Sequence, residues 1–285
     1  MMHIMTQDEM AFWQEHGYVI LRDAVPQANV DAVVDIIWEF MDMDRDDPET
    51  WYRSTDGHEG KPKLKESGMA ELYQHQALWD NRQHPRVYGA FADIWGAENL
   101  WVSIDRVNLN PPARADWDFQ GFVHWDIDTS LVPLPNRVQG LLSLVDVPAD
   151  AGGLQVVPGF HRRFDEWVKT QPTDRNPRAP DMTGLELKSL AMNAGDLVIW
   201  HSLLPHGTGR NHSSRPRLAQ YITMFPARED DEAMRQERVS LWRERKSPDR
   251  KFFPGDPRRW EIERSKTAKL TPLGEKLLGL KDWSS

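Results

Sequence analysis

The sequence contains no cysteine among its 285 residues. This absence excludes disulfides, thiolate metal ligands and a cysteine nucleophile, and it fits a reducing compartment such as the cytoplasm. The sequence also lacks an apolar run of about 18 residues, so no segment is expected to span a membrane. The N-terminus has no charged segment followed by an apolar one, which argues against a secretory signal. These absences predict a soluble, cytoplasmic protein.

Basic residues are fewer than acidic residues. The chain has 35 Lys and Arg against 44 Asp and Glu, which gives a formal net charge of −9 at pH 7. Nucleic acids and anionic membranes attract an excess of basic residues, so we expect neither as a partner and expect a small-molecule substrate instead. Tryptophan, in contrast, is abundant at 13 residues, and such large aromatic side chains are expected in the core and in pocket walls.

Helix signals are concentrated in the N-terminal third of the chain. Thr6 and Glu9 have the spacing of a capping box, and Gly17 is placed to end the helix that they begin. Further helices are predicted at residues 26–41, 69–79 and 85–95. The polar segment 42–68 is predicted to be a solvated loop, with a lid over a site as the alternative.

Short apolar segments separated by Gly and Pro turns follow from residue 100 onward. The predicted strands lie at 100–109, 122–129, 139–147, 154–157, 185–190, 197–200 and 218–225. A surface helix at 229–246, a basic loop at 246–259 and a last helix at 271–280 complete the chain. We therefore predict a mainly β protein with flanking α-helices. It would form one domain over 1–285, with a helical part at 6–96, a β core at about 97–227 and a C-terminal extension at 228–285.

The segment Phe122-Val123-His124-Trp125-Asp126 places an imidazole and a carboxylate two residues apart. In a strand, side chains at i and i+2 leave the same face, so His124 and Asp126 can converge on one point. Trp125 leaves the opposite face and is a candidate pocket-wall residue that would contact substrate. With a second His from elsewhere in the chain, these two donors would form the facial triad that holds non-haem Fe(II) and leaves coordination positions open.

A second histidine is available about 80 residues farther along. The candidates are His201, His206 and His212. His206 precedes Gly207-Thr208-Gly209, where backbone can approach a ligand closely. Arg217 is predicted at the start of a strand, where its guanidinium could hold a carboxylate through two parallel hydrogen bonds. The Thr208 hydroxyl could donate another bond to the same carboxylate.

Several motifs occur together and in order. They are residues 12–21, the His-x-Asp segment at 122–126, the Gly-Gly and Pro-Gly turns at 152–161, residues 195–201 and 204–209, and Arg215-Pro216-Arg217. Over about residues 8–225, this series resembles the phytanoyl-CoA dioxygenase family of Fe(II)- and 2-oxoglutarate-dependent oxygenases. The resemblance implies a double-stranded β-helix, a cupin-like jelly-roll barrel with the metal at its mouth.

The resemblance also implies roles for individual residues. The implied Fe(II) ligands are His124, Asp126 and His206. Arg217, helped by Thr208, would hold the far carboxylate of 2-oxoglutarate. Asn110 stands where many relatives have Lys, so Asn108 or Asn110 is expected to hydrogen-bond this cosubstrate. Leu141 lies where many relatives carry a Trp, so the walls of the cosubstrate pocket are expected to differ.

The implied activity is the oxidation of an unactivated C–H bond in a small organic substrate, with O2 and 2-oxoglutarate consumed and succinate and CO2 released. Halogenating relatives replace the carboxylate of the triad with a small residue, so Asp126 favours hydroxylation or a related oxidation such as desaturation. No catalytic residue beyond the metal ligands is required. The alternatives are a cupin-type isomerase, an oxygenase that needs no cosubstrate, and a non-catalytic binding relative. The first two have no reason to hold Arg217 at its spacing from His206, and the complete triad with Arg217 speaks against the third.

Overall fold

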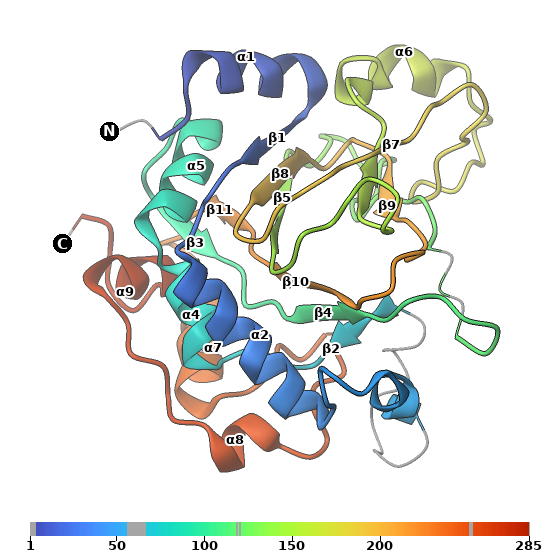
Figure 1. Cartoon of the computed structure of the whole chain (residues 1–285). Coiled ribbons are helices and arrows are strands. Elements are labelled where there is room, and N and C mark those ends of the chain that lie inside the picture. The colour runs from blue at the N-terminus through green and yellow to red at the C-terminus, as the bar shows by residue number, and fades with distance from the viewer. Residues whose placement is uncertain (1–3, 56–66, 118, 120, 251–252, 285) are drawn as a thin grey trace.

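A six-stranded antiparallel sheet lies at the centre of the fold (Figure 1). The computed structural model describes residues 4–55, 67–117, 119, 121–250 and 253–284. The strand order is β1-β8-β5-β10-β4-β2. The strands are β1 Tyr18–Leu21, β8 Leu197–His201, β5 Val138–Ser143, β10 Arg217–Tyr221, β4 Val107–Asn110 and β2 Met69–Ala70. Neighbouring strands are therefore distant in the sequence, and side chains from far along the chain meet on one surface.

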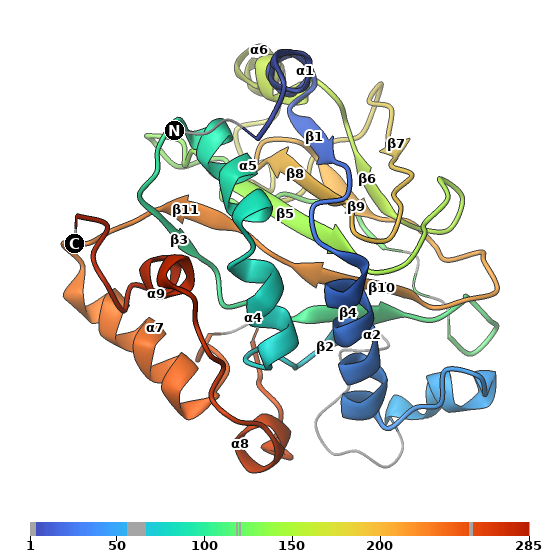
Figure 2. The ribbon, with the colours of Figure 1, turned by 60° about the vertical axis from the view of Figure 1, so that its left-hand side comes forward.

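Two smaller antiparallel sheets complete the β structure. One has the order β7-β6-β9, with β7 Lys188–Ser189, β6 Leu154–Val156 and β9 His206–Thr208. An isolated bridge between His124 and His206 adds the His-x-Asp segment to the edge of this sheet. The other sheet pairs β11 Met224–Pro226 with β3 Leu100–Val102 and continues the direction of β10 and β4 (Figure 2).

The alternation of side chains along each strand divides the six-stranded sheet into two faces. One face packs against α2 Gln27–Met41, α4 Gln76–Arg82 and α5 Pro85–Trp95. Its buried apolar residues are Val107, Leu109, Leu142, Leu197, Ile199 and Leu218. The other face packs against the β7-β6-β9 sheet through Leu141, Val198, Trp200 and Ala219. Because the polar residues Asn108, Asn110 and Arg217 lie on that second face, they are buried between the two sheets.

The remaining helices cover the ends of the sheets. They are α1 Gln7–His16, the 3-10 helices η1 Pro48–Thr55 and η2 Phe160–Arg162, α6 Phe164–Lys169, α7 Glu232–Glu244, α8 Trp260–Arg264 and α9 Pro272–Leu278. The capping box is confirmed, because the Glu9 N–H donates to Thr6 Oγ1 over 3.2 Å and the Thr6 N–H donates to Glu9 Oε2 over 2.7 Å. Gly17 ends α1 with a φ of 74°, as its position predicts.

Several predicted elements are wrong in detail. The strand predicted at 218–225 is divided into β10 and β11, which belong to different sheets. The helix predicted at 69–79 is a short strand followed by α4, because pairing of Met69 with Asn108 holds the backbone extended. The strand predicted at 100–109 is divided into β3 and β4, which belong to different sheets. The strand predicted at 122–129 makes only the bridge at His124. Of the predicted loop 42–68, residues 48–55 form η1, and 56–66 lie outside the described residues.

The fold class is mixed α/β with antiparallel sheets, so the prediction of a mainly β protein underestimated the helices. Within the described residues, hydrogen bonds between strands do not join the two larger sheets into one closed barrel. In the same part of the chain, no helix is both long enough and apolar enough to cross a membrane.

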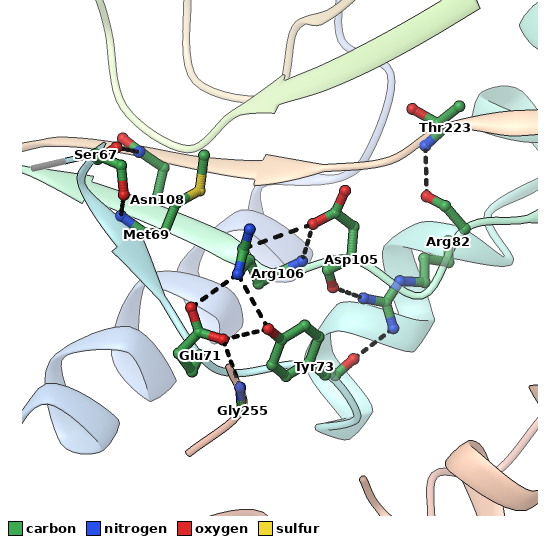
Figure 3. A network of polar contacts seen from close by, with 11 residues as sticks. Ser67, Met69, Glu71, Tyr73, Arg82, Asp105, Arg106, Asn108, Thr223 and Gly255 are labelled. Atoms are coloured by element: carbon green, nitrogen blue, oxygen red, sulfur yellow. Dashed lines mark hydrogen bonds and ion pairs between the residues drawn. The ribbon is translucent and has the colours of Figure 1, made fainter. Parts of the chain in front are cut away.

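A buried ion pair ties the C-terminal segment to the six-stranded sheet (Figure 3). Arg106 Nη1 donates to Glu71 Oε1 over 2.8 Å, and the two side chains are 8% and 4% exposed. The Tyr73 hydroxyl and the Gly255 N–H both donate to the other oxygen of Glu71. The guanidinium of Arg106 also lies 4.3 Å from the centroid of the Phe253 ring. The Glu71 carboxylate therefore joins the segment after β2, the start of β4 and the C-terminal extension.

We predict that Glu71→Ala destabilises the protein by about 3 kcal/mol, because the buried Arg106 loses its nearest counterion and keeps only the Asp105 carboxylate at 3.9 Å. The measurement is the free energy of unfolding in urea. Glu166→Ala is the matched control. It removes the partner of Lys169, and the two side chains of that pair are 64% and 81% exposed. The control should lose only about 0.5 kcal/mol. Equal losses in both variants would contradict a structural role for the Glu71 pair.

Candidate metal centre

His124, Asp126 and His206 meet at the edge of the β7-β6-β9 sheet. The backbones of the two histidines pair directly, with the His124 N–H donating to His206 O over 2.9 Å and the His206 N–H donating to His124 O over 3.2 Å. Asp126 Oδ1 lies 3.5 Å from His124 Nε2, and Asp126 Oδ2 lies 3.4 Å from His206 Nε2. One donor atom from each residue falls within 4.8 Å of the others, a spacing that can surround a single cation with bonds of roughly 2 Å.

Backbone carbonyls orient both imidazole rings. His206 Nδ1 lies 2.9 Å from the Leu204 carbonyl oxygen, and His124 Nδ1 lies 3.2 Å from that of Phe122. A carbonyl can only accept, so each Nδ1 carries a hydrogen. Each Nε2 faces Asp126: it donates to that carboxylate while the ring is protonated, and its lone pair would become available to a metal once that proton is lost. Metal-binding histidines are commonly fixed in this way, with the second ring nitrogen donating to a carbonyl or carboxylate. The donor set fits a divalent metal of the Fe(II) type.

Asp126 is held in its ionised form. Burial works to raise the pKa of Asp126, but hydrogen bonds with His124 and His206, and the charges of these histidines, outweigh it and hold that pKa well below its usual range. The Gln139 side-chain amide also donates to Asp126 Oδ2, and the Arg178 guanidinium donates to the Asp126 carbonyl oxygen. These contacts restrain a side chain that is 54% exposed.

Sequence reasoning missed Gln139 and Arg178, which come from β5 and from the loop before β7. Gln139 did offer a signal, because it lies two and four positions before Leu141 and Ser143 in a predicted strand and so shares their inward face. Arg178 offered none, because only the path of its loop brings it to Asp126.

Arg217 lies on the facing sheet, buried to 6% exposure at the start of β10. Its Nη1 donates to the Gly152 carbonyl oxygen over 2.7 Å, and its Nη2 donates to Asn108 Oδ1 over 3.1 Å. Its cross-strand partner is Asn110. Among the described residues, Arg217 Nε and Asn110 Nδ2 are both buried without an acceptor. Two unpaired donors, one of them on a guanidinium, fit a bound carboxylate.

The other predicted site residues take different positions. Thr208 lies on β9, on the same face as His206 and two residues farther along. Trp125 is 1% exposed, and its indole N–H donates to the Leu203 carbonyl oxygen over 2.8 Å. Its ring packs against Phe160, Phe164 and Trp167. This aromatic cluster lies on the side opposite to the triad, so the placement of Trp125 favours packing over substrate contact.

His201 and His212 stay outside the triad, so geometry selects His206 from the three candidates. His212 is exposed. His201 Nδ1 accepts the Leu203 N–H over 3.1 Å, and its ring lies 5.3 Å from that of His161. Burial, with a smaller contribution from the nearby His161, lowers the pKa of His201 to about 4.

The family model described as phytanoyl-CoA dioxygenase (PhyH) matches residues 13–219. Among curated proteins, the chain is similar to one from Dictyostelium discoideum that bears this family's name. The two are 25% identical over 260 residues, which cover 75% of this chain and 74% of the relative.

Solved structures show the same fold. A hypothetical protein of Escherichia coli superposes with a TM-score of 0.71 at 16% identity, covering 96% of this chain and 82% of that one. The non-haem α-ketoglutarate-dependent carbocyclase SnoK from nogalamycin biosynthesis superposes with a TM-score of 0.55 at 23% identity, covering 81% of this chain and 90% of that one.

His201 should make stability depend on pH. Its pKa of about 4 in the folded protein lies below the value of about 6.5 expected in an unfolded chain. The unfolded chain therefore binds more protons between these values, and the free energy of unfolding should fall as the pH is lowered from about 6.5 toward about 4. His201→Asn, whose amide oxygen can still accept the Leu203 N–H, should show a smaller fall in urea unfolding. An unchanged pH slope would contradict this assignment.

Proposed function

The chain belongs to the phytanoyl-CoA dioxygenase family of 2-oxoglutarate-dependent dioxygenases, and from this premise we propose that it hydroxylates a C–H bond of a small organic substrate, with release of succinate and CO2. The observation that supports this most directly is the convergence of His124, Asp126 and His206 at one point. The buried Arg217, which has no carboxylate partner among the described residues, adds a place for the cosubstrate.

His124 Nε2, the Asp126 carboxylate and His206 Nε2 would hold Fe(II). When bound, the iron supplies the activation of O2 and the oxidation of the C–H bond, and 2-oxoglutarate supplies the remaining electrons. The two carbonyl contacts keep the rings in place, and Gln139 restrains the carboxylate. The chain itself needs no general base, because its task is to position the reactants and to exclude water.

Arg217 and Asn110 would bind the far carboxylate of 2-oxoglutarate through the two donors that lack acceptors. Asn108 accepts from Arg217 Nη2, so its role is to position the guanidinium. Thr208 would add a hydroxyl donor from the facing sheet. A cavity of only about 10 Å³ lies beside Arg217, with Leu141 and Leu154 among its walls, so neighbouring side chains would have to move for the cosubstrate to enter.

The arrangement of the two sheets also supports a proposal for the fold. The six-stranded sheet and the β7-β6-β9 sheet would be the two halves of a double-stranded β-helix, with the His124 segment at its edge. Their inward side chains share one apolar cluster, which supports this arrangement. The chain would form a single domain, with helices before the barrel and a C-terminal extension from residue 228 across its open end.

The first test is succinate formation from 2-oxoglutarate in the presence of Fe(II), ascorbate and air. His206→Ala and Arg217→Ala should each lose at least about 100-fold, since residues that only support metal ligands are already worth about 10–100-fold. The matched controls are His212→Ala and Arg215→Ala, which remove exposed residues of the same types. They should keep wild-type rates. Similar losses in the controls would contradict the assignment.

A second test separates the metal from the cosubstrate. Under anaerobic conditions, the wild-type protein should bind a single Fe(II) and then show the visible absorption of the Fe(II)–2-oxoglutarate complex. Asp126→Ala should lose Fe(II) binding, because it removes the charged ligand of the triad. Arg217→Ala should keep Fe(II) but bind 2-oxoglutarate at least about tenfold more weakly, because a charge-assisted hydrogen bond is lost. A wild-type protein that forms no complex would overturn the proposed function.

A further inference from the structure

A cavity of about 570 Å³ lies between the β11-β3 sheet, α7 and the segment that follows α7. Its apolar walls include Trp95, Ile104, Val138, Phe225, Met234 and Leu241. Figure 2 shows α9 between α7 and the β11-β3 pair, on the side of the molecule toward which β10 and β4 continue. The volume is within the range of sites that enclose a small organic ligand.

One end of this cavity lies near the triad. Val138 is in its wall and directly precedes Gln139, whose amide donates to Asp126. Asp105 is also in the wall. Burial raises the pKa of Asp105, and the negative charge of Asp126 adds to that rise, which places the two carboxylates within electrostatic range of each other. None of His124, Asp126 and His206 lines the cavity, so its connection to the metal centre runs through Asp105 and the backbone at the start of β5.

The far wall contains a buried cation, Arg238 of α7, which is 6% exposed. Its Nε donates to Leu278 O over 3.0 Å, and its Nη2 donates to Val102 O and Leu277 O over 2.7 and 2.9 Å. These three carbonyl groups fix the guanidinium but do not neutralise it. Among the described residues, Nη1 makes no hydrogen bond and no carboxylate pairs with Arg238.

This arrangement differs from that of Arg106, which is similarly buried but has the Glu71 carboxylate at 2.8 Å. A buried charge without a counterion is costly, and proteins usually pair it. The surroundings of Arg238 increase the need for an anion. Burial, and then the like charge of Arg250, lower the pKa of Arg238 to about 9. Arg250 also lines the cavity, and its one ion pair is a long contact of 3.9 Å with Glu237.

The whole cavity has a positive balance in a protein whose net charge is −9. Its charged lining residues are Arg137, Arg228, Arg238, Arg250, Asp105 and Glu237. The acids are already engaged: Glu237 contacts Arg250 over 3.9 Å, and Asp105 accepts the Arg106 N–H over 2.8 Å and lies 3.9 Å from Arg106 Nε. The positive groups thus remain for a ligand, and a guanidinium is well suited to carboxylate and phosphate oxygens.

We propose that this cavity binds the prime substrate and that Arg238 holds an oxyanion on it, a carboxylate or a phosphate-type group, with the apolar body of the substrate against the cavity walls. The identity of the ligand as the substrate rests on the proposed function. The anion site itself rests on Arg238 and the cavity.

The test is a calorimetric titration of the full chain with probes that share one apolar tail. Octanoate and octyl phosphate present the two kinds of oxyanion, and 1-octanol is the neutral match. We expect at least one of the two anions to bind about tenfold more tightly than the alcohol, the size of a charge-assisted hydrogen bond. The tighter of the two identifies which oxyanion the site prefers. Equal affinity for the alcohol and both anions would overturn the proposal, and that outcome requires no variant.

Arg238→Met removes the charge and keeps an apolar side chain of similar length. It should reduce the affinity for the preferred anion to that of the alcohol, and Arg238→Lys should restore part of the difference. Arg243→Met changes an exposed arginine of the same helix and should leave every affinity unchanged. Arg238 also donates to three backbone carbonyls, so replacing it removes contacts that hold the fold. Arg250→Met is therefore a second variant, because the Arg250 side chain is 60% exposed. Arg250→Met should weaken anion binding by a smaller factor than Arg238→Met. If Arg250→Met and Arg238→Lys both bind the anion with wild-type affinity, the anion site is contradicted.

The dioxygenase proposal and the anion-site proposal can be contradicted independently of each other. Asp126→Ala should bind the anionic probe as the wild-type protein does, since the probe site is formed without the metal. Anion preference without succinate formation by the wild-type protein would remove the dioxygenase proposal and leave the anion site. Succinate formation without anion preference would remove only the present inference.

Discussion

The site depends on the backbone pairing between His124 and His206. Two hydrogen bonds of 2.9 and 3.2 Å join segments that are 82 residues apart in the sequence. This pairing sets the distance between the two imidazoles, and it brings Asp126 to both rings at once, because a residue two positions along an extended segment returns to the same face. The Leu204 and Phe122 carbonyls then orient the rings. A donor set formed by backbone geometry exists before any metal arrives, so little of the binding energy is needed to arrange it.

Three buried arginines show how one residue type serves different purposes. Arg106 has a carboxylate partner and joins the sheet to the C-terminal segment. Arg217 and Arg238 are equally buried, but within the described part of the chain their acceptors are uncharged carbonyl and amide oxygens. A fourth buried arginine, Arg82, donates among the described residues only to the Tyr73 and Asp105 carbonyl oxygens and acts as structure without a counterion. Arg217 and Arg238 differ from Arg82 because each lines a cavity, where an anion can supply the missing charge. On the same reasoning, we propose Arg217 as the residue that holds the cosubstrate and Arg238 as the residue that holds the substrate.

The C-terminal extension takes part in this arrangement. The sequence shows it as a charged helix and a basic loop, with nothing to connect either to the triad. In the structure, α7 provides Arg238 and the following segment provides Arg250 and Phe253, and all three line one cavity. The Glu71 carboxylate holds the nearby backbone at Gly255 (Figure 3). The C-terminal extension therefore covers the end of the six-stranded sheet and also forms part of the wall of the 570 Å³ cavity.

Local chemistry allowed much of this protein to be predicted from its sequence. Capping residues such as Thr6 and Gly17 act within a few positions, and the His-x-Asp spacing alone puts His124 and Asp126 on one face. The series of motifs was sufficient to recognise the family, which the family model confirms. The failures were all non-local. The helix expected at 69–79 gave way to pairing of Met69 with Asn108, and Gln139 and Arg178 reach Asp126 only through the fold. Trp125 packs into a distant aromatic cluster, and Arg238 lines its cavity only because α7 docks against β3 and α9. Contacts between residues far apart in the sequence leave no periodic signal, so only the tertiary structure could decide them.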